Sequence, residues 1–214
     1  VKGSVGANVA LGEAVAEVNA MLADYEAPAG ITLDLGGTVE DQGDSFSDIL
    51  TLLILIIILV YIVMASQFES LAYPFIIMFT IPFAMSGVFI ALWMTNTPLS
   101  IIALIGAIML VGIVTKNGIV LVDYTNLLVE RGWNINDAVI AGGKSRLRPV
   151  LMTSLTTILG MVPMAMGIGE GSEIWQPMGI AVVGGLLMST ILTLFIVPAL
   201  YAMLEGIKER KAAR

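Results

Sequence analysis

The sequence predicts an all-α membrane bundle of about five transmembrane helices, preceded by the tail of an α+β domain outside the membrane. Hydrophobic residues make up 57% of the 214 residues and charged residues only 13%, whereas a soluble domain is usually about one quarter charged. A helix needs roughly 20 apolar residues to cross a bilayer. Four stretches without any charge reach that length: residues 49–68, 70–115, 149–169 and 174–204.

Residues 1–45 are expected to form the end of a larger extramembrane domain. Residues 1–48 carry nine acidic residues against one basic residue, Lys2. Apolar residues at helical spacing between Ala10 and Tyr25 predict a helix, and alternation over residues 31–35 predicts a half-buried strand. One helix and one strand cannot bury a core. The chain is therefore expected to be a slice of a longer protein, which its start at Val1 rather than at Met also suggests.

Residues 46–206 are expected to hold the membrane bundle, followed by a short cytoplasmic tail at residues 207–214. Polar or turn-forming segments separate the apolar stretches, and Pro149 is expected in the first turn of the fourth span. Glycines such as Gly112, Gly118 and the pair Gly184–Gly185 are expected to allow close helix packing. The five spans are expected at about residues 46–66, 73–94, 99–128, 149–166 and 178–204.

The basic residues predict how the bundle lies in the inner (plasma) membrane. Four of them lie between the third and fourth spans and four follow the fifth, while the loops at residues 95–98 and 167–177 have none. With five spans, both basic regions fall on one side, which the positive-inside rule assigns to the cytoplasm. The acidic N-terminal segment is then periplasmic or extracellular. The basic residues are Arg131, Lys144, Arg146 and Arg148, then Lys208, Arg210, Lys211 and Arg214.

Several functional classes are disfavoured by composition. The chain has no Cys and no His, so thiolate metal sites, cysteine nucleophiles and the commonest metal ligand and general base are missing. Its net charge of −7 speaks against a nucleic-acid partner. The segment Gly143-Lys-Ser145 resembles the end of a phosphate-binding loop, but Ala138 stands where the first glycine is required. We expect no enzyme and no cofactor.

Lys116 is the one basic residue inside a predicted span. A lysine at the bilayer centre costs about 2.5–3.5 kcal/mol on insertion scales, so it normally faces a partner or a water-filled path. The alternative is a lysine that snorkels to the interface. Asp123 lies on the same helix face but about 10 Å along the axis, too far for direct contact. We therefore expect the partner carboxylate on another segment or chain, with Asn117 and Asp123 as possible lining residues.

Three separated motifs resemble the resistance-nodulation-division (RND) efflux pumps, hydrophobe/amphiphile branch: residues 68–75 (FESLAYPF), 112–124 (GIVTKNGIVLVDY) and 146–154 (RLRPVLMTS). Order and spacing match the last five of that family's twelve spans, and residues 1–45 resemble the end of its second porter region. The resemblance implies a proton-driven antiporter that works as a homotrimer and exports drugs or other amphiphiles. In Gram-negative cells it implies a periplasmic adaptor and an outer-membrane channel as partners.

The resemblance also implies roles for individual residues. Lys116 matches the family's relay lysine, whose ammonium pairs with two aspartates on the fourth span. Arg146 and Thr153 match the relay's arginine and threonine. Many relatives carry Asn at the Lys116 position, so Lys favours the proton-coupled type. The aspartates lie in the part of the pump that this sequence lacks, so the partner of these residues would be the rest of the same pump.

Two other classes stay open. The chain could be a complete small membrane protein that assists or regulates a larger pump, as a half-transporter without transport of its own. It could also be a passive channel or a lipid-handling relative of the RND pumps. Collapse of the proton gradient would separate an antiporter from a channel.

Overall fold

The computed structural model describes residues 17–18, 20–22, 38–169 and 171–212, and all regular structure within them is helical. The chain divides into two compact units, residues 1–48 and residues 49–214. In the first unit, residues 17–18 and 20–22 are helical, as the expected helix requires. The strand expected at residues 31–35 lies outside the described residues.

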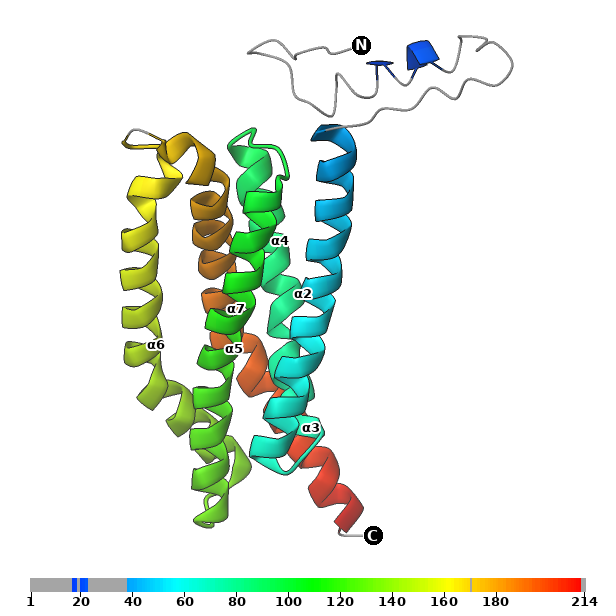
Figure 1. Cartoon of the computed structure of the whole chain (residues 1–214). Helices are drawn as coiled ribbons and strands as arrows, with labels where there is room; N and C mark the ends of the chain where they lie inside the picture. Colours follow the sequence, from blue (N-terminus) through cyan, green and yellow to red (C-terminus); the bar gives the residue numbers. More distant parts are fainter. Residues whose placement is uncertain (1–16, 19, 23–37, 170, 213–214) are drawn as a thin grey trace, which may run out of the picture. The chain divides into compact units, whose positions relative to one another are not determined.

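The membrane bundle is all α-helical, which confirms the predicted fold class (Figure 1). Among the described residues, five segments are long and apolar enough to cross a bilayer. The second of them consists of two consecutive helices, α3 and α4. The helices are α2 (Thr38–Phe68), α3 (Ala72–Met78), α4 (Thr80–Met94), α5 (Ile101–Glu130), α6 (Ile135–Ala165) and α7 (Ser172–Ala212).

The helix α7 is the centre of the bundle, because it packs against α4, α5 and α6. Its contact with α4 is very close: a Cβ added to Gly184 would lie 2.2 Å from Ala91 Cβ. A Cβ on Gly185 would lie 2.1 Å from Leu110 Cδ2 of α5. Small residues at such positions let helix backbones approach in a membrane, as predicted for this pair. Gly112, by contrast, faces open space, so close packing at this position is not found within the described bundle.

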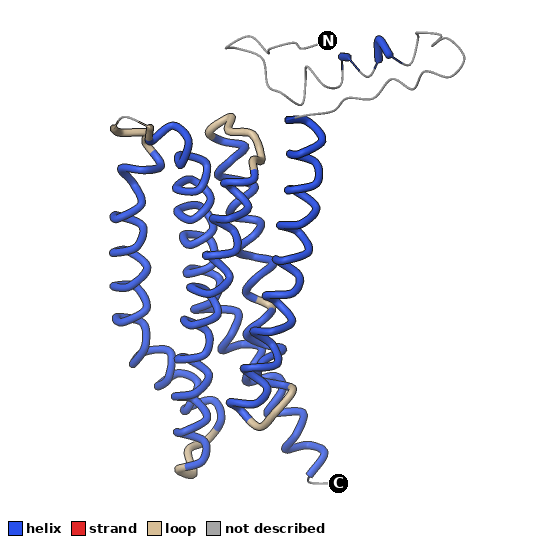
Figure 2. Tube along the Cα trace, in the orientation of Figure 1, coloured by secondary structure: helices blue, strands red, loops and turns tan. Residues whose placement is uncertain are grey.

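The expected second span is broken at Phe79, between α3 and α4 (Figure 2). Pro82 explains the position of the break. A proline has no N–H to donate to the carbonyl four residues earlier, and its ring crowds that carbonyl; here the carbonyl belongs to Met78, the last residue of α3. The hydroxyl of Thr80 donates to Ile77 O at 2.6 Å and stabilises the junction.

The helix α6 begins at Ile135, well before Pro149, so the expectation that Pro149 opens this helix is wrong. Asn134 caps the helix by accepting a hydrogen bond from Asn136 N–H at 3.1 Å, and Asp137 lies in the first turn. Both features stabilise a helix N-terminus. Pro149 and Pro163 lie inside α6, and Figure 1 shows the helix bending along its lower part.

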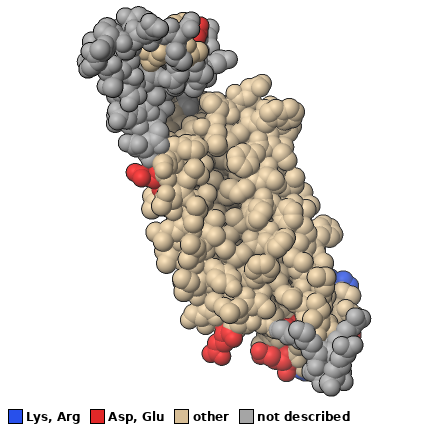
Figure 3. Space-filling view, turned by 90° about the vertical axis from the view of Figure 1, so that its right-hand side faces the viewer, with Lys and Arg blue, Asp and Glu red and all other residues tan. Residues whose placement is uncertain are grey.

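The surface of the bundle matches a hydrocarbon environment. Large apolar side chains such as Val63, Leu159 and Phe195 are exposed. Figure 3 shows that the middle of one face is formed by uncharged residues, with acidic and basic side chains near its lower end. An exposed apolar belt of this length is what a bilayer covers. The described part of the chain therefore has the surface and the helix lengths of a multi-pass membrane bundle.

Candidate relay groove between two membrane helices

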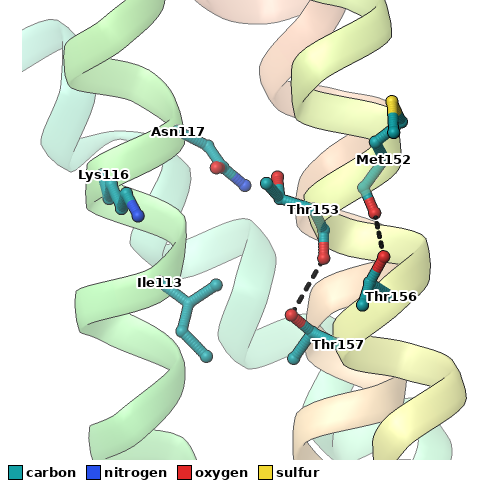
Figure 4. Close-up of a pocket in the computed structure, with 7 residues that line it drawn as sticks. All are labelled: Ile113, Lys116, Asn117, Met152, Thr153, Thr156 and Thr157. Atoms are coloured by element: carbon teal, nitrogen blue, oxygen red, sulfur yellow. Dashed lines mark hydrogen bonds between the residues drawn. The ribbon is translucent and has the colours of Figure 1, made fainter.

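A groove of about 440 Å³ opens between α5 and α6. The helix α5 contributes a short cluster around Lys116, and α6 contributes three threonines and a methionine. In Figure 4, Ile113 and Asn117 of α5 point toward Thr153 and Thr157 of α6 across the gap between the two helices, whereas Met152 and Thr156 lie on the side of α6 farther from α5. The lining residues are Ile113, Lys116, Asn117, Met152, Thr153, Thr156 and Thr157.

Helical periodicity places these residues on one face of each helix. Lining positions on both helices recur three and four residues apart, the spacing of neighbours on one helix face. Ser154, next to Thr153 in the sequence, points to a different face of α6, the one that packs on α7. It is buried and accepts a hydrogen bond from Thr190 of α7. The helix α6 therefore has two polar faces, one toward the groove and one toward α7.

The groove threonines donate their hydroxyl protons to their own helix. Thr153 Oγ1 lies 3.1 Å from Pro149 O and 3.0 Å from Val150 O. Thr156 and Thr157 donate to the carbonyls of Met152 and Thr153, at 2.8 and 2.9 Å. A hydroxyl oxygen that has donated can still accept a hydrogen bond. The α6 wall can therefore offer acceptors to a cation, and Lys116 has three N–H donors.

Lys116 is exposed to the groove in this structure, and none of the lining residues is acidic. Asp123, one of the expected lining residues, is exposed and does not line the groove. The groove thus presents a cation and neutral oxygens without a carboxylate in its described walls. A buried ammonium needs a carboxylate or a comparable set of acceptors to offset its desolvation.

Arg146 lies outside the groove lining and contacts Tyr124 instead. Its Cζ atom is 4.6 Å from the centroid of the Tyr124 ring, a cation–π contact between α6 and α5. Its Nε atom is buried and has no hydrogen-bond partner among the described residues. The structure therefore brings Lys116, Asn117 and Thr153 together and leaves Arg146 and Asp123 apart from them.

Sequence reasoning alone missed the contribution of Ile113, Met152 and Tyr124. Ile113 lies three residues before Lys116, and Met152 lies one residue before Thr153. Helical spacing could therefore have identified both once the two helices were paired. Tyr124 follows Asp123 directly, on nearly the same face as Lys116. The aromatic ring eight residues after Lys116 is the sequence feature that could have indicated a partner for Arg146.

Comparison with known proteins places the chain in a family. The profile of the AcrB/AcrD/AcrF family matches residues 1–205. The multidrug resistance protein MdtC of Erwinia tasmaniensis is 38% identical over 204 residues, which cover 94% of this chain and 20% of that protein. The cobalt-zinc-cadmium resistance protein CzcA of Cupriavidus metallidurans is 36% identical over 194 residues, covering 90% and 18%.

A solved structure agrees with these sequence matches. The X-ray structure of a heavy-metal efflux pump superposes with a TM-score of 0.79 at 32% identity, covering 90% of this chain and 20% of that one. The chain thus spans about one fifth of the length of the relatives it matches. With a family match over nearly its whole length, the chain belongs to the AcrB/AcrD/AcrF family of resistance-nodulation-division efflux transporters.

Proposed function

We propose that this chain supplies the lysine side of a transmembrane proton relay in a proton-driven antiporter that exports drugs or other amphiphilic compounds. One observation carries the proposal: Lys116 faces a threonine-lined groove inside the membrane bundle, and no acidic residue lines that groove. An ionisable residue within a membrane span is costly and usually functional. The rest of a complete RND pump, including its aspartate-bearing half, supplies the missing carboxylates on the open side.

The relay works through competition for the ammonium group of Lys116. While the aspartates are charged, they hold the ammonium by ion pairing. When they take up protons, the pairing weakens and Lys116 turns to neutral acceptors such as Asn117 and Thr153. The change in local charge then favours a different arrangement of the two halves of the membrane domain. Arg146 is the second cation of this relay, and Asp123, which lies outside the groove lining, has no direct part in it.

The proposal also includes the orientation of the chain in the membrane and the partners of the complete pump. The basic ends of the bundle face the cytoplasm, and the acidic residues 1–45 belong to a periplasmic porter domain. The complete pump acts as a homotrimer, and in a Gram-negative cell it works with a periplasmic adaptor and an outer-membrane channel. The orientation is tested by locating both termini with protease protection. The same assay is repeated on a variant in which the basic residues near the end of the chain are replaced by acidic ones.

The test of the relay is Lys116→Ala in the complete transporter, reconstituted in proteoliposomes with an imposed proton gradient. We expect proton-driven export to fall by roughly 5- to 150-fold, the range of a typical coupling energy between two sites. Lys144→Ala is the matched control, because Lys144 is exposed on α6 and does not line the groove. Wild-type export by Lys116→Ala at equal protein amount would overturn the proposal. Export that survives collapse of the gradient would identify a passive channel instead.

Metal export is the second candidate, because CzcA is a cobalt-zinc-cadmium resistance protein and the superposed structure is that of a heavy-metal efflux pump. The same proteoliposomes separate the two substrate classes. Export of a cationic dye or a detergent supports the amphiphile proposal. Export of Zn²⁺, Co²⁺ or Cd²⁺ without dye export supports the metal candidate.

The size of the native product tests whether the chain acts as part of a complete pump. An antibody against residues 208–214 should detect a species several times heavier than 22.7 kDa in source membranes. A species of 22.7 kDa would instead favour a half-transporter that assists a larger pump. In that case, a partner chain that co-purifies with it and carries the acidic residues is expected.

A further inference from the structure

Tyr124 of α5 and Arg146 of α6 form a side-chain contact between the two helices that involves a charged group of the proposed relay. The guanidinium carbon lies 4.6 Å above the Tyr124 ring, within the distance at which a cation is attracted to the face of an aromatic ring. Both side chains are half-buried, so water screens this attraction only in part. The contact joins the helix that carries Lys116 to the helix that carries Thr153.

The backbones of α5 and α6 pack closely next to this contact. Next to Tyr124, Thr125 is buried, and its Oγ1 would lie 2.5 Å from a Cβ added to Gly142 of α6. The two helices therefore touch through a glycine one turn before Arg146. Thr125 Oγ1 donates to Leu121 O at 2.8 Å, which fixes its side chain against its own helix. The separation of Tyr124 from Arg146 is thus set by backbone packing, and the long Arg146 side chain is the part that can move.

Arg146 rests on the ring without full hydrogen bonding. Its Nε–H is buried, and within the described part of the chain it finds no acceptor. An unsatisfied buried donor destabilises the position, while the ring attraction stabilises it by a similar order of magnitude. The two effects nearly offset each other, so the side chain can leave the ring when an acceptor is offered elsewhere.

We infer that Tyr124 is a positioning residue for Arg146: its ring face holds the guanidinium between α5 and α6 in a rest position that the side chain leaves during transport. The inference rests on the relay role proposed for Arg146. It requires the ring of Tyr124 and not its hydroxyl, because the cation lies over the face of the ring. Tyr124→Phe keeps that face, whereas Tyr124→Leu and Tyr124→Met remove it with side chains suited to a membrane helix.

The experiment measures proton-driven export in the complete transporter, with rates taken over a range of substrate concentrations. Tyr124→Phe should transport at the wild-type rate. Tyr124→Leu should lower the maximal rate by roughly three- to tenfold, the effect of losing one cation–π contact, and leave the KM for substrate unchanged. Tyr124→Met, which is flexible and fills space, replaces the Leu variant if the latter folds poorly. A Phe variant as slow as the Leu variant would overturn the inference.

A double-mutant cycle separates this inference from the relay proposal. In an Arg146→Ala background, Tyr124→Leu should add no further loss of export, and their effects on the thermal unfolding of the purified transporter should also be non-additive. Additive effects on unfolding would show that the two side chains do not interact and would overturn the inference. If Arg146→Ala exports at the wild-type rate, the relay role of Arg146 is wrong, and the positioning role of Tyr124 is then wrong as well. Non-additive effects on unfolding would in that case still show that the two side chains are in contact.

Discussion

Thr190 of α7 donates a hydrogen bond to Ser154 Oγ of α6, with the two oxygens 2.9 Å apart and both side chains buried. This bond fixes the rotation of α6 about its axis. Because Thr153 precedes Ser154 in the helix, the same bond sets which way the groove threonines face. The interior contact between α6 and α7 thus positions the groove wall opposite Lys116.

The first prediction concerns this bond. Thr190→Val keeps the shape of the side chain and removes the donor, so Ser154 loses its partner in α7. Hydrogen bonds between membrane helices contribute about 0.6 kcal/mol on average and up to ~1.7 kcal/mol, and we expect a loss in that range, read as a lower unfolding temperature of the complete transporter. Thr156→Val is the control, because Thr156 is exposed and bonds within its own helix. Equal losses from both variants would refute the prediction.

The second prediction concerns the close contact of α7 with α4. A Cβ at Gly184 would lie 2.2 Å from Ala91 Cβ and 2.8 Å from Gly87 O. Gly184→Ala must therefore push the two helices apart, at a cost of about 1–3 kcal/mol for overpacking. Gly112→Ala should have the opposite sign and stabilise by about 0.5–1 kcal/mol, because open space surrounds Gly112 and Ala favours helix. Thermal unfolding in detergent measures both, and a stabilising Gly184→Ala would contradict the packing described here.

The membrane spans were predictable because four charge-free stretches of sufficient length mark them, one of which covers the second span and the first part of the third. Charge and length do not show where a helix extends beyond the bilayer. The helix α6 continues through polar residues back to Ile135, and its start depends on a cap by Asn134. The break at Phe79 was not predicted either, because it arises from crowding of one carbonyl by Pro82 within an apolar stretch.

The groove was only half predictable from the sequence. Lys116 stood out because an ammonium in an apolar span is costly, and Thr153 came from the resemblance to the RND pumps. Thr153, Thr156 and Thr157 form a hydroxyl-rich cluster already in the sequence, but that they share a lining with Lys116 depends on the pairing of α5 with α6. The contact of Arg146 with Tyr124 likewise depends on the approach of Gly142 to Thr125.

The third prediction concerns the far end of the bundle, where Tyr73 of α3 donates to Glu205 Oε1 of α7 at 2.7 Å. The Tyr73 ring also stacks on Tyr201 at 5.6 Å between centroids, and Tyr201 donates to Asn126 of α5. Tyr73→Phe keeps the stack and removes the bond, so we expect a loss of about 1.5–3 kcal/mol, the range for a hydrogen bond to a charged group. A double-mutant cycle with Glu205→Gln should be non-additive. Additive losses would mean that the bond contributes nothing to stability.

The fourth prediction connects α3 with the helix that carries Lys116. Gly118 of α5 is buried, and a Cβ there would lie 2.8 Å from Ile77 Cγ2 of α3. The β-branched Ile77 is stiff at χ1 and fully buried, so it cannot turn away. Gly118→Ala should therefore displace α5 from α3, destabilise the transporter by about 1–3 kcal/mol and slow proton-driven export by moving Lys116 relative to α6.

A second substitution tests that reason directly. Ile77→Ala alone leaves a cavity and should cost about 2–5 kcal/mol, but it removes the atom that the new Cβ meets. The double variant Gly118→Ala with Ile77→Ala should therefore be more stable than the sum of the two single losses predicts, and it should export faster than Gly118→Ala alone. Unfolding temperature and export rate are measured on the same preparations of the complete transporter. If the two losses simply add, Gly118 does not act through Ile77, and contact with α3 does not set the position of α5.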